Sequence, residues 1–377
     1  MAIAAILVAG AVGSCGDDDG GQPLAVHFGD SDRDGVRDGH LTPEQAERMS
    51  DDDLLIVSIG DSVAAGEGNP DVEGRGLAGG QRWTLRRCHR SLWSGHAEAA
   101  DDAERDDEQT DVGFVPLGCS GATIEKGLLG SYRGIDPALI EMREPPQVDR
   151  VNALAEKREI DALLLSVGAN DVNFSKIVSF CLRFDECWRR PFDPDAWPLF
   201  APSADDPREP DGRRRTLEEV VKRRLAALPE AYARFDTKLS DDIPRGRVVI
   251  VEYFDSTTGP SPRGPAPCRW EHGIGRIRGV ITPDEFRWAQ REVLQPLNAA
   301  VHAAADAHGW RVVGGVSRRF AGHGICAGAD RWVRDLDESL VVQGLNHTGT
   351  LHPNRAGHRE TGDLIEPVLA EVLAGSR

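Results

Sequence analysis

A serine hydroxyl directly follows one of the most apolar runs of the chain. Residues 54–59 are apolar except for Ser58, and Gly60, Asp61 and Ser62 come next. A nearly continuous apolar run of this length is typical of a strand buried on both faces of a parallel sheet. Open α/β sheets carry their chemistry just beyond the carboxyl ends of such strands, so a nucleophile is expected at Ser62. The structural alternative for this serine is a helix cap.

Three further segments carry polar or glycine residues where catalytic groups are expected. Apolar strands predicted to end near residues 117 and 167 lead to Gly121 and Asn170, and His352 precedes a proline and a final helix. Acyl transfer needs an activated hydroxyl, a base and N–H donors for the developing oxyanion. Taken singly, these residues also fit a core glycine, a turn-capping asparagine and a buried histidine.

Together the four segments resemble the signature blocks of the SGNH hydrolases, the GDSL-type lipases and esterases. The matching residues are 60–62 (Gly-Asp-Ser), 118–121 (Gly-Cys-Ser-Gly), 168–171 (Gly-Ala-Asn-Asp) and 352–354 (His-Pro-Asn), in the family's order. The run 119–123 and the cysteine placement look like the secreted actinobacterial esterase/lipase branch. The resemblance covers about residues 54–373 and implies a flavodoxin-like fold. It also implies hydrolysis of carboxylic esters, with no metal or organic cofactor for catalysis.

The resemblance assigns a role to each matching residue. Ser62 is expected to be the nucleophile and His352 the base. The backbone N–H groups of Ser62 and Gly121 and the side-chain amide of Asn170 are expected to form the oxyanion hole.

One position departs from the family pattern. Members usually have an Asp three residues before the catalytic histidine, and this chain has Gly349 there. We expect the Gly349 carbonyl to accept the Nδ1 hydrogen bond of the histidine, as in a Ser–His dyad, with Asp335 or Asp337 as alternatives. His347 and His358 are rival bases.

Strand and helix patterns alternate along residues 51–377, which form one expected hydrolase domain. Strands are predicted at 54–59, 113–117, 162–167, 247–253 and 310–313, and helices at 91–105, 145–157, 216–239, 284–308 and 357–373. This alternation predicts a three-layer α/β/α sandwich with a mainly parallel five-stranded sheet. The loops 69–90, 172–212 and 254–283 are expected to shape the pocket.

Composition restricts the partners. The formal net charge of −18 argues against a general nucleic-acid binder, and 40% hydrophobic residues suffice for a large core. Residues 1–15 look like an export signal ending in a lipobox-like Cys15, which predicts lipidation and membrane anchoring. The alternative is a plain N-terminal extension.

Residues 16–50 form an acidic polar leader. Within it, carboxylates alternate and a glycine follows, as in a calcium loop, with candidate ligands at Asp30, Asp32, Asp34 and Asp38. The full EF-hand pattern fails because Leu41 stands where the bidentate Glu belongs. A solvated tether is the alternative.

Cysteine usage supports an exported chain. Besides Cys15 there are six cysteines, an even number that suggests three disulfides. The expected pairs are Cys88–Cys119, Cys181–Cys187 and Cys268–Cys326. We therefore expect an exported, monomeric serine esterase or lipase, extracellular or on the cell surface, acting on small-molecule or lipid esters. A cell-envelope or carbohydrate O-deacetylase, or a catalytically silent surface-binding protein, is the alternative.

Overall fold

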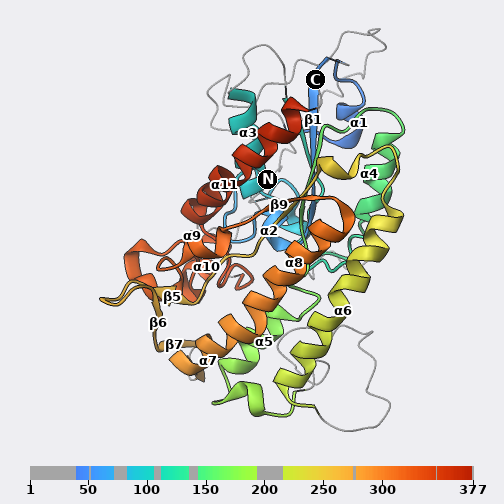
Figure 1. Cartoon of the computed structure of the whole chain (residues 1–377). Helices are drawn as coiled ribbons and strands as arrows, with labels where there is room; N and C mark the ends of the chain where they lie inside the picture. The colour runs from blue at the N-terminus through green and yellow to red at the C-terminus, as the bar shows by residue number, and fades with distance from the viewer. Residues whose placement is uncertain are drawn as a thin grey trace, which may run out of the picture.

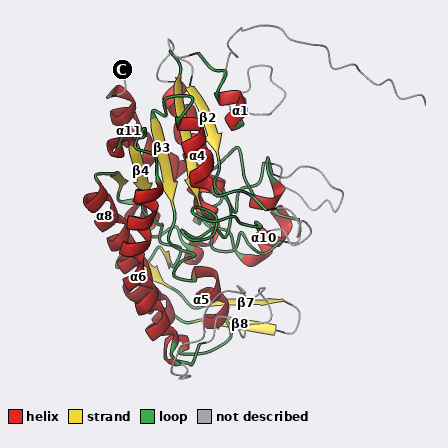
Figure 2. Ribbon diagram, turned by 90° about the vertical axis from the view of Figure 1, so that its right-hand side faces the viewer, coloured by secondary structure: helices red, strands yellow, loops and turns green. Residues whose placement is uncertain are grey.

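The computed structural model describes residues 40–50, 52–71, 83–105, 112–135, 143–192, 215–274, 277–344 and 346–375. Its centre is a five-stranded sheet in the order β2-β1-β3-β4-β9, in which all neighbours are parallel (Figures 1 and 2). The strands are β1 Leu54–Gly60, β2 Val112–Pro116, β3 Ala162–Ser166, β4 Val248–Val251 and β9 Arg311–Val313. Every residue of β1 is buried, as the nearly continuous apolar run predicts.

Helices cover both faces of the sheet. The helices α3 Gly95–Arg105 and α11 Arg355–Ala374 pack together on one face, and α4 Gln147–Ala155, α6 Leu217–Lys238 and α8 Gln295–His308 cover the other (Figure 1). The longest of them, α6, begins at a capping box between Thr216 and Glu219 and buries its apolar stripe. The predicted α/β/α sandwich is thus confirmed.

The predicted helix 284–308 is divided in the structure. It consists of α7 Pro283–Ala289, a π-helical turn at Gln290–Leu294, and α8. Pro296 has no backbone N–H to donate to the preceding turn, which accounts for a break in the regular hydrogen-bond ladder here.

Shorter elements lie around this framework, and several of them cluster beyond one end of the sheet (Figure 2). The helices are α1 Pro43–Ala46, α2 Ser62–Ala65, α5 Phe174–Cys181, α9 Val316–Phe320 and α10 Leu336–Val342. The strands are β5 Thr258–Gly259, β6 Ala266–Pro267, β7 Trp270–Ile274 and β8 Ile277–Ile281, which form two small antiparallel pairs. The 3₁₀ turns are Arg86–Cys88, Cys187–Arg189, Arg245–Arg247 and Ile325–Asp330.

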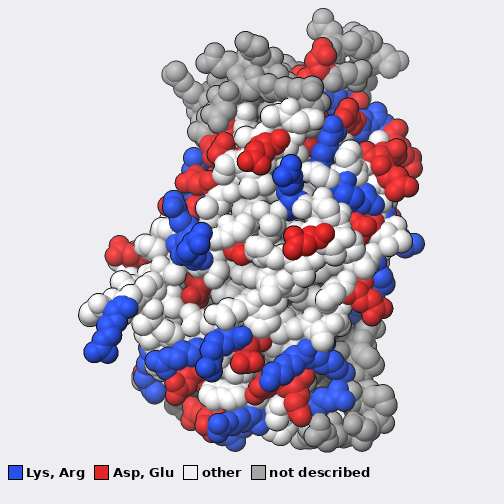
Figure 3. Space-filling view, in the orientation of Figure 1, with Lys and Arg blue, Asp and Glu red and all other residues white. Residues whose placement is uncertain are grey.

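All three expected disulfides are present, joining Cys88 to Cys119, Cys181 to Cys187 and Cys268 to Cys326. The predicted signal, Cys15 and the calcium-like carboxylates Asp30, Asp32, Asp34 and Asp38 lie outside the described residues. Within the described part of the chain, no helix is long and apolar enough to cross a membrane. On the face shown in Figure 3, acidic and basic side chains are interspersed.

Candidate active site

Ser62 is the first residue of α2 and follows β1 through a tight turn. Gly60 has φ +134°, and a Cβ there would lie 2.0 Å from the Ser166 carbonyl oxygen, so only glycine fits. Asp61 caps α2 by accepting the Val63 N–H at 3.0 Å. Its other oxygen accepts the Tyr253 hydroxyl at 2.6 Å. Burial raises the pKa of Asp61 to about 7. Its contacts fit a structural role, holding the nucleophile's turn.

His352 lies beside this serine although 290 positions separate them in the chain. Its Nε2 is 2.8 Å from the Ser62 Oγ, and both residues are buried. Burial lowers the pKa of His352, while the charge of Glu67 opposes that shift. The ring is therefore neutral near pH 7 and able to accept a proton.

The rival histidines do not make this contact. His358 is buried in α11, where its Nδ1 accepts the Gly95 N–H and its Nε2 bonds the Glu67 carbonyl. The pKa of His347 is lowered by burial, and Ser62 bonds to His352 instead.

The prediction that the Gly349 carbonyl orients His352 is wrong. That carbonyl accepts the backbone N–H of His352 at 2.9 Å, because the chain turns back on itself here. The imidazole Nδ1 has no hydrogen-bond partner among the described residues. The nearby Thr350 and Thr348 carbonyls do favour the protonated ring, raising its pKa, but neither reaches hydrogen-bond geometry with Nδ1.

The two alternative carboxylates do not reach this ring either. Asp335 caps α10 through the Glu338 N–H and pairs with Arg331. Asp337 is mostly exposed and lies 3.9 Å from His272. Both alternatives are therefore wrong as well.

The three expected oxyanion donors come from adjoining segments. The backbone N–H groups of Ser62 and Gly121 have no acceptor within the described part of the structure. The Asn170 side chain donates one amide hydrogen to the Ala122 carbonyl at 3.0 Å, which leaves its second hydrogen available. Two interactions fix the loop that carries Gly121. One is the Cys88–Cys119 disulfide, and the other is the buried Arg90 side chain, which donates to the backbone carbonyls of the two residues before Cys119.

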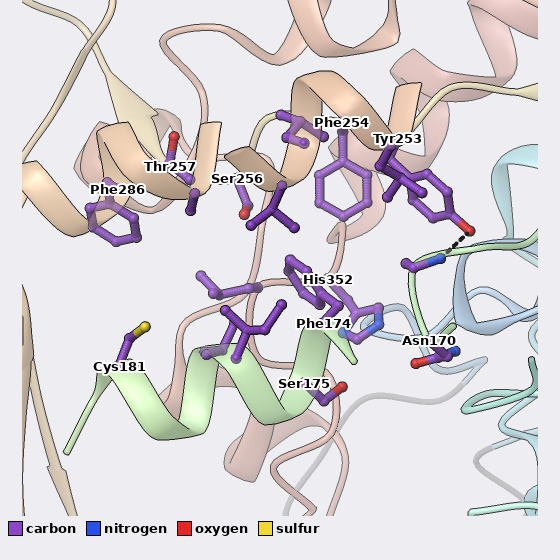
Figure 4. A pocket seen from close by; sticks show the side chains of 18 of the residues that line it. Asn170, Phe174, Ser175, Cys181, Tyr253, Phe254, Ser256, Thr257, Phe286 and His352 are labelled. Atoms are coloured by element: carbon purple, nitrogen blue, oxygen red, sulfur yellow. Dashed lines mark hydrogen bonds between the residues drawn. The ribbon is translucent and has the colours of Figure 1, made fainter. Parts of the chain in front are cut away.

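An apolar pocket extends from Ser62, Asn170 and His352 along α5 (Figure 4). Phe286 and Cys181 lie at the end away from Asn170 in this view. Much of its other apolar lining comes from four places: α5, the end of β8, the α7–α8 region and the segment after β4. These side chains are Phe174, Ile177, Val178, Phe254, Ile281, Ala289, Val293, Leu294 and Leu297. The predicted pocket loops 172–212 and 254–283 both contribute, with α5 as an element that the sequence analysis missed.

Two buried polar groups were also missed. Glu67 is fully buried and its carboxylate collects four side-chain donors beneath the site. The sequence around Glu67 gives one hint of this role: a charged residue stands between two glycines shortly after Ser62. Separately, His96 bridges Ser58 at 2.7 Å and Ser166 at 2.9 Å. Burial lowers its pKa to about 3, and these residues do not line the pocket, so they tie α3 to the sheet.

No group of three potential ligands among the described residues could hold a metal ion. The calcium expectation concerns the leader and is not addressed by these residues.

Comparison with known proteins identifies the family. A family model described as the GDSL-like lipase/acylhydrolase family matches residues 58–360, which is most of the chain. No curated protein sequence matches. Among solved structures, an extracellular lipase from Streptomyces rimosus is similar at 18% identity and TM-score 0.48, covering 85% of this chain and 99% of that one. A phospholipase A1 from Streptomyces albidoflavus is also similar at 18% identity and TM-score 0.46, with the same coverage. From the family model, the chain belongs to the GDSL-like lipase/acylhydrolase family and is a carboxylic ester hydrolase.

Proposed function

We propose that Ser62 and His352 form a nucleophile–base pair that cleaves carboxylic esters through an acyl-enzyme. The observation that supports this most is the 2.8 Å contact between His352 Nε2 and Ser62 Oγ at one end of an apolar pocket. A hydroxyl bonded to a neutral imidazole is the arrangement that nucleophilic acyl transfer requires.

The proposed reaction has two halves. Ser62 Oγ attacks the ester carbonyl as His352 Nε2 takes its proton, and the oxyanion accepts hydrogen bonds from the Ser62 and Gly121 N–H groups and the Asn170 amide. Collapse breaks the bond to the alcohol, which leaves with the proton from His352. A water molecule then attacks the acyl-enzyme, again giving its proton to His352, and releases the carboxylic acid with Ser62 restored.

The pocket also suggests the kind of acyl group. Apart from Ser175 and Glu285, the side chains that line the pocket along α5 and the α7–α8 region are apolar, and burial of each methylene contributes about 0.8 kcal/mol. The substrate we propose is therefore an ester of a medium or long acyl chain, with the chain lying along Ile177, Val178 and Leu294. An acetyl group would leave this lining unused, so the pocket gives no support to the O-deacetylase alternative.

The test is hydrolysis of p-nitrophenyl esters with acyl chains from acetyl to palmitoyl. We expect kcat/KM to rise with chain length over the short esters, and Ser62→Ala to lower kcat at least about a thousandfold. Turnover by Ser62→Ala close to the wild-type rate would refute the nucleophile. A preference for acetate over all longer esters would refute the acyl-chain assignment.

We further propose that the protein is exported and anchored by a lipid on Cys15. Three disulfides are typical of oxidising compartments and support export. Expression of the full chain in a bacterial host with labelled palmitate tests this. Label is expected in the membrane fraction for the wild type and not for Cys15→Ser; unlabelled wild-type protein would refute anchoring.

A further inference from the structure

Glu67 connects three segments of the site through its carboxylate. It lies just after α2, where its backbone N–H donates to the Ser62 carbonyl at 2.9 Å. Oε2 accepts the Ser120 hydroxyl at 2.6 Å and His89 Nδ1 at 2.8 Å. Oε1 accepts the Thr348 hydroxyl at 2.8 Å. One carboxylate thus joins the nucleophile's turn, the loop before Gly121 and the loop before His352.

A second route runs from the same oxygen to the histidine loop. Gln343 Nε2 donates to Glu67 Oε1 at 2.6 Å, and Gln343 Oε1 accepts the Gly349 N–H at 2.8 Å. Gly349 in turn accepts the backbone N–H of His352. The position where the family usually has an Asp is therefore hydrogen-bonded, through one amide side chain, to a carboxylate from another part of the chain.

We propose that Glu67 is the positioning residue for His352 and replaces the missing Asp. It acts through the hydrogen-bonded loop and through its negative charge, without a direct bond to the imidazole. The inference rests on the proposed function, because it assumes that His352 acts as the base on Ser62.

The charge on Glu67 is secured by its surroundings. Burial alone would raise the pKa of this carboxyl, but His89, His352 and the donated hydrogen bonds outweigh burial and hold the pKa well below its usual range. The negative charge of the Glu67 carboxylate affects two other titratable groups. It raises the pKa of His352 and adds to the effect of burial that raises the pKa of Tyr132 to about 12.

The sign of its effect on His352 does not depend on the neighbours. His89 and His358 also interact with this ring, and a positive charge on either would lower the pKa of His352. Removing the negative charge of Glu67 lowers the pKa of His352 further whether His89 is charged or neutral. It also removes stabilisation from the imidazolium that forms during attack.

The test compares pH–rate profiles of Glu67→Gln and the wild type on p-nitrophenyl butyrate. We expect kcat to fall about tenfold to a hundredfold with little change in KM, and the acid limb to move down by about one pH unit. The matched control is Asp161→Asn, a buried carboxylate that accepts the Leu55 N–H near the start of β1, at the opposite end of that strand from Ser62. It should leave the acid limb in place.

A second variant covers the case in which Glu67→Gln does not fold. Thr348→Val removes one hydrogen bond between the carboxylate and the histidine loop but keeps the charge. We expect kcat to fall about fivefold, because one oriented hydrogen bond is lost, while KM and the acid limb stay unchanged. Wild-type kcat with an unmoved acid limb in Glu67→Gln would overturn the inference, and where that variant does not fold, wild-type kcat in Thr348→Val would overturn it.

Labelling with a fluorophosphonate separates this result from a failure of the proposed function. If the wild type is labelled on Ser62 and hydrolyses the ester, unchanged variants refute only the role of Glu67. If Ser62 of the wild type is not labelled, the proposed function fails and this inference with it.

Discussion

Gly121 allows the sharpest prediction about the oxyanion site. Its φ is +81°, and a Cβ at this position would lie 2.4 Å from the Tyr132 hydroxyl oxygen, a contact that real Cβ atoms essentially never make. In Gly121→Ala the loop or the Tyr132 side chain must therefore move by more than half an ångström, and the left-handed backbone adds about 1–2 kcal/mol of strain to the loop. We expect the loop to shift, which displaces an N–H that we propose donates to the oxyanion, and losing one such donor costs about 10²–10³ in kcat.

The assay is kcat on p-nitrophenyl butyrate, with thermal unfolding measured alongside. Gly264→Ala is the matched control, since Gly264 has φ +102° but nothing within 4 Å of the added Cβ. It should lower stability and leave kcat unchanged. Adding Tyr132→Phe to Gly121→Ala removes the clashing hydroxyl and should restore part of the lost kcat. A folded Gly121→Ala enzyme with wild-type kcat would refute the reasoning.

Three further outcomes are expected. Asn170→Ala should lower kcat about a hundredfold with little effect on KM, because it removes a donor to the oxyanion; unchanged steady-state kcat would contradict this. Val178→Trp should narrow the pocket beside α5 and lower kcat/KM for dodecanoyl esters about tenfold more than for acetyl esters; equal losses for both would contradict it. Burial raises the pKa of Asp171 to about 7. Between pH 4 and 7 the Asp171 carboxyl is therefore protonated in the folded protein but ionised in the unfolded chain, where its pKa is about 4. Because the folded state binds the extra proton, the contribution of Asp171 to the free energy of unfolding falls as pH rises through this range, by up to about 1.4 kcal/mol per pH unit. Urea unfolding should show a smaller loss between pH 5 and 7 in Asp171→Asn than in the wild type; identical slopes would contradict this.

The parts of the fold set by local pattern could be predicted from the sequence. The β1 run is apolar except for Ser58, and α6 has a capping box and a regular apolar stripe, so each element is determined by its own residues. The proximity of Ser62 and His352 could be predicted from the resemblance to the SGNH hydrolases and from the position of Ser62 at the carboxyl end of a parallel strand. The helix α5 was missed because it has only eight residues and its first cap, Asn173, has positive φ and makes no side-chain cap bond.

The surroundings of His352 could not be predicted for a different reason. Sequence spacing shows that Gly349 lies near the histidine but not where its carbonyl points. The partners of Glu67 come from positions 89, 120, 343 and 348, so its environment exists only in the folded chain. A glycine-flanked glutamate has no local signal for a buried, fully bonded carboxylate.

The central proposal is that Ser62 becomes acylated with His352 as its base. Peptide mass spectrometry after reaction with a fluorophosphonate tests this most directly. We expect one adduct on the peptide that contains Ser62, none on that peptide in Ser62→Ala, and much slower labelling in His352→Ala. An adduct on any other serine of an active enzyme, or labelling of Ser62 at the wild-type rate without His352, would contradict the account.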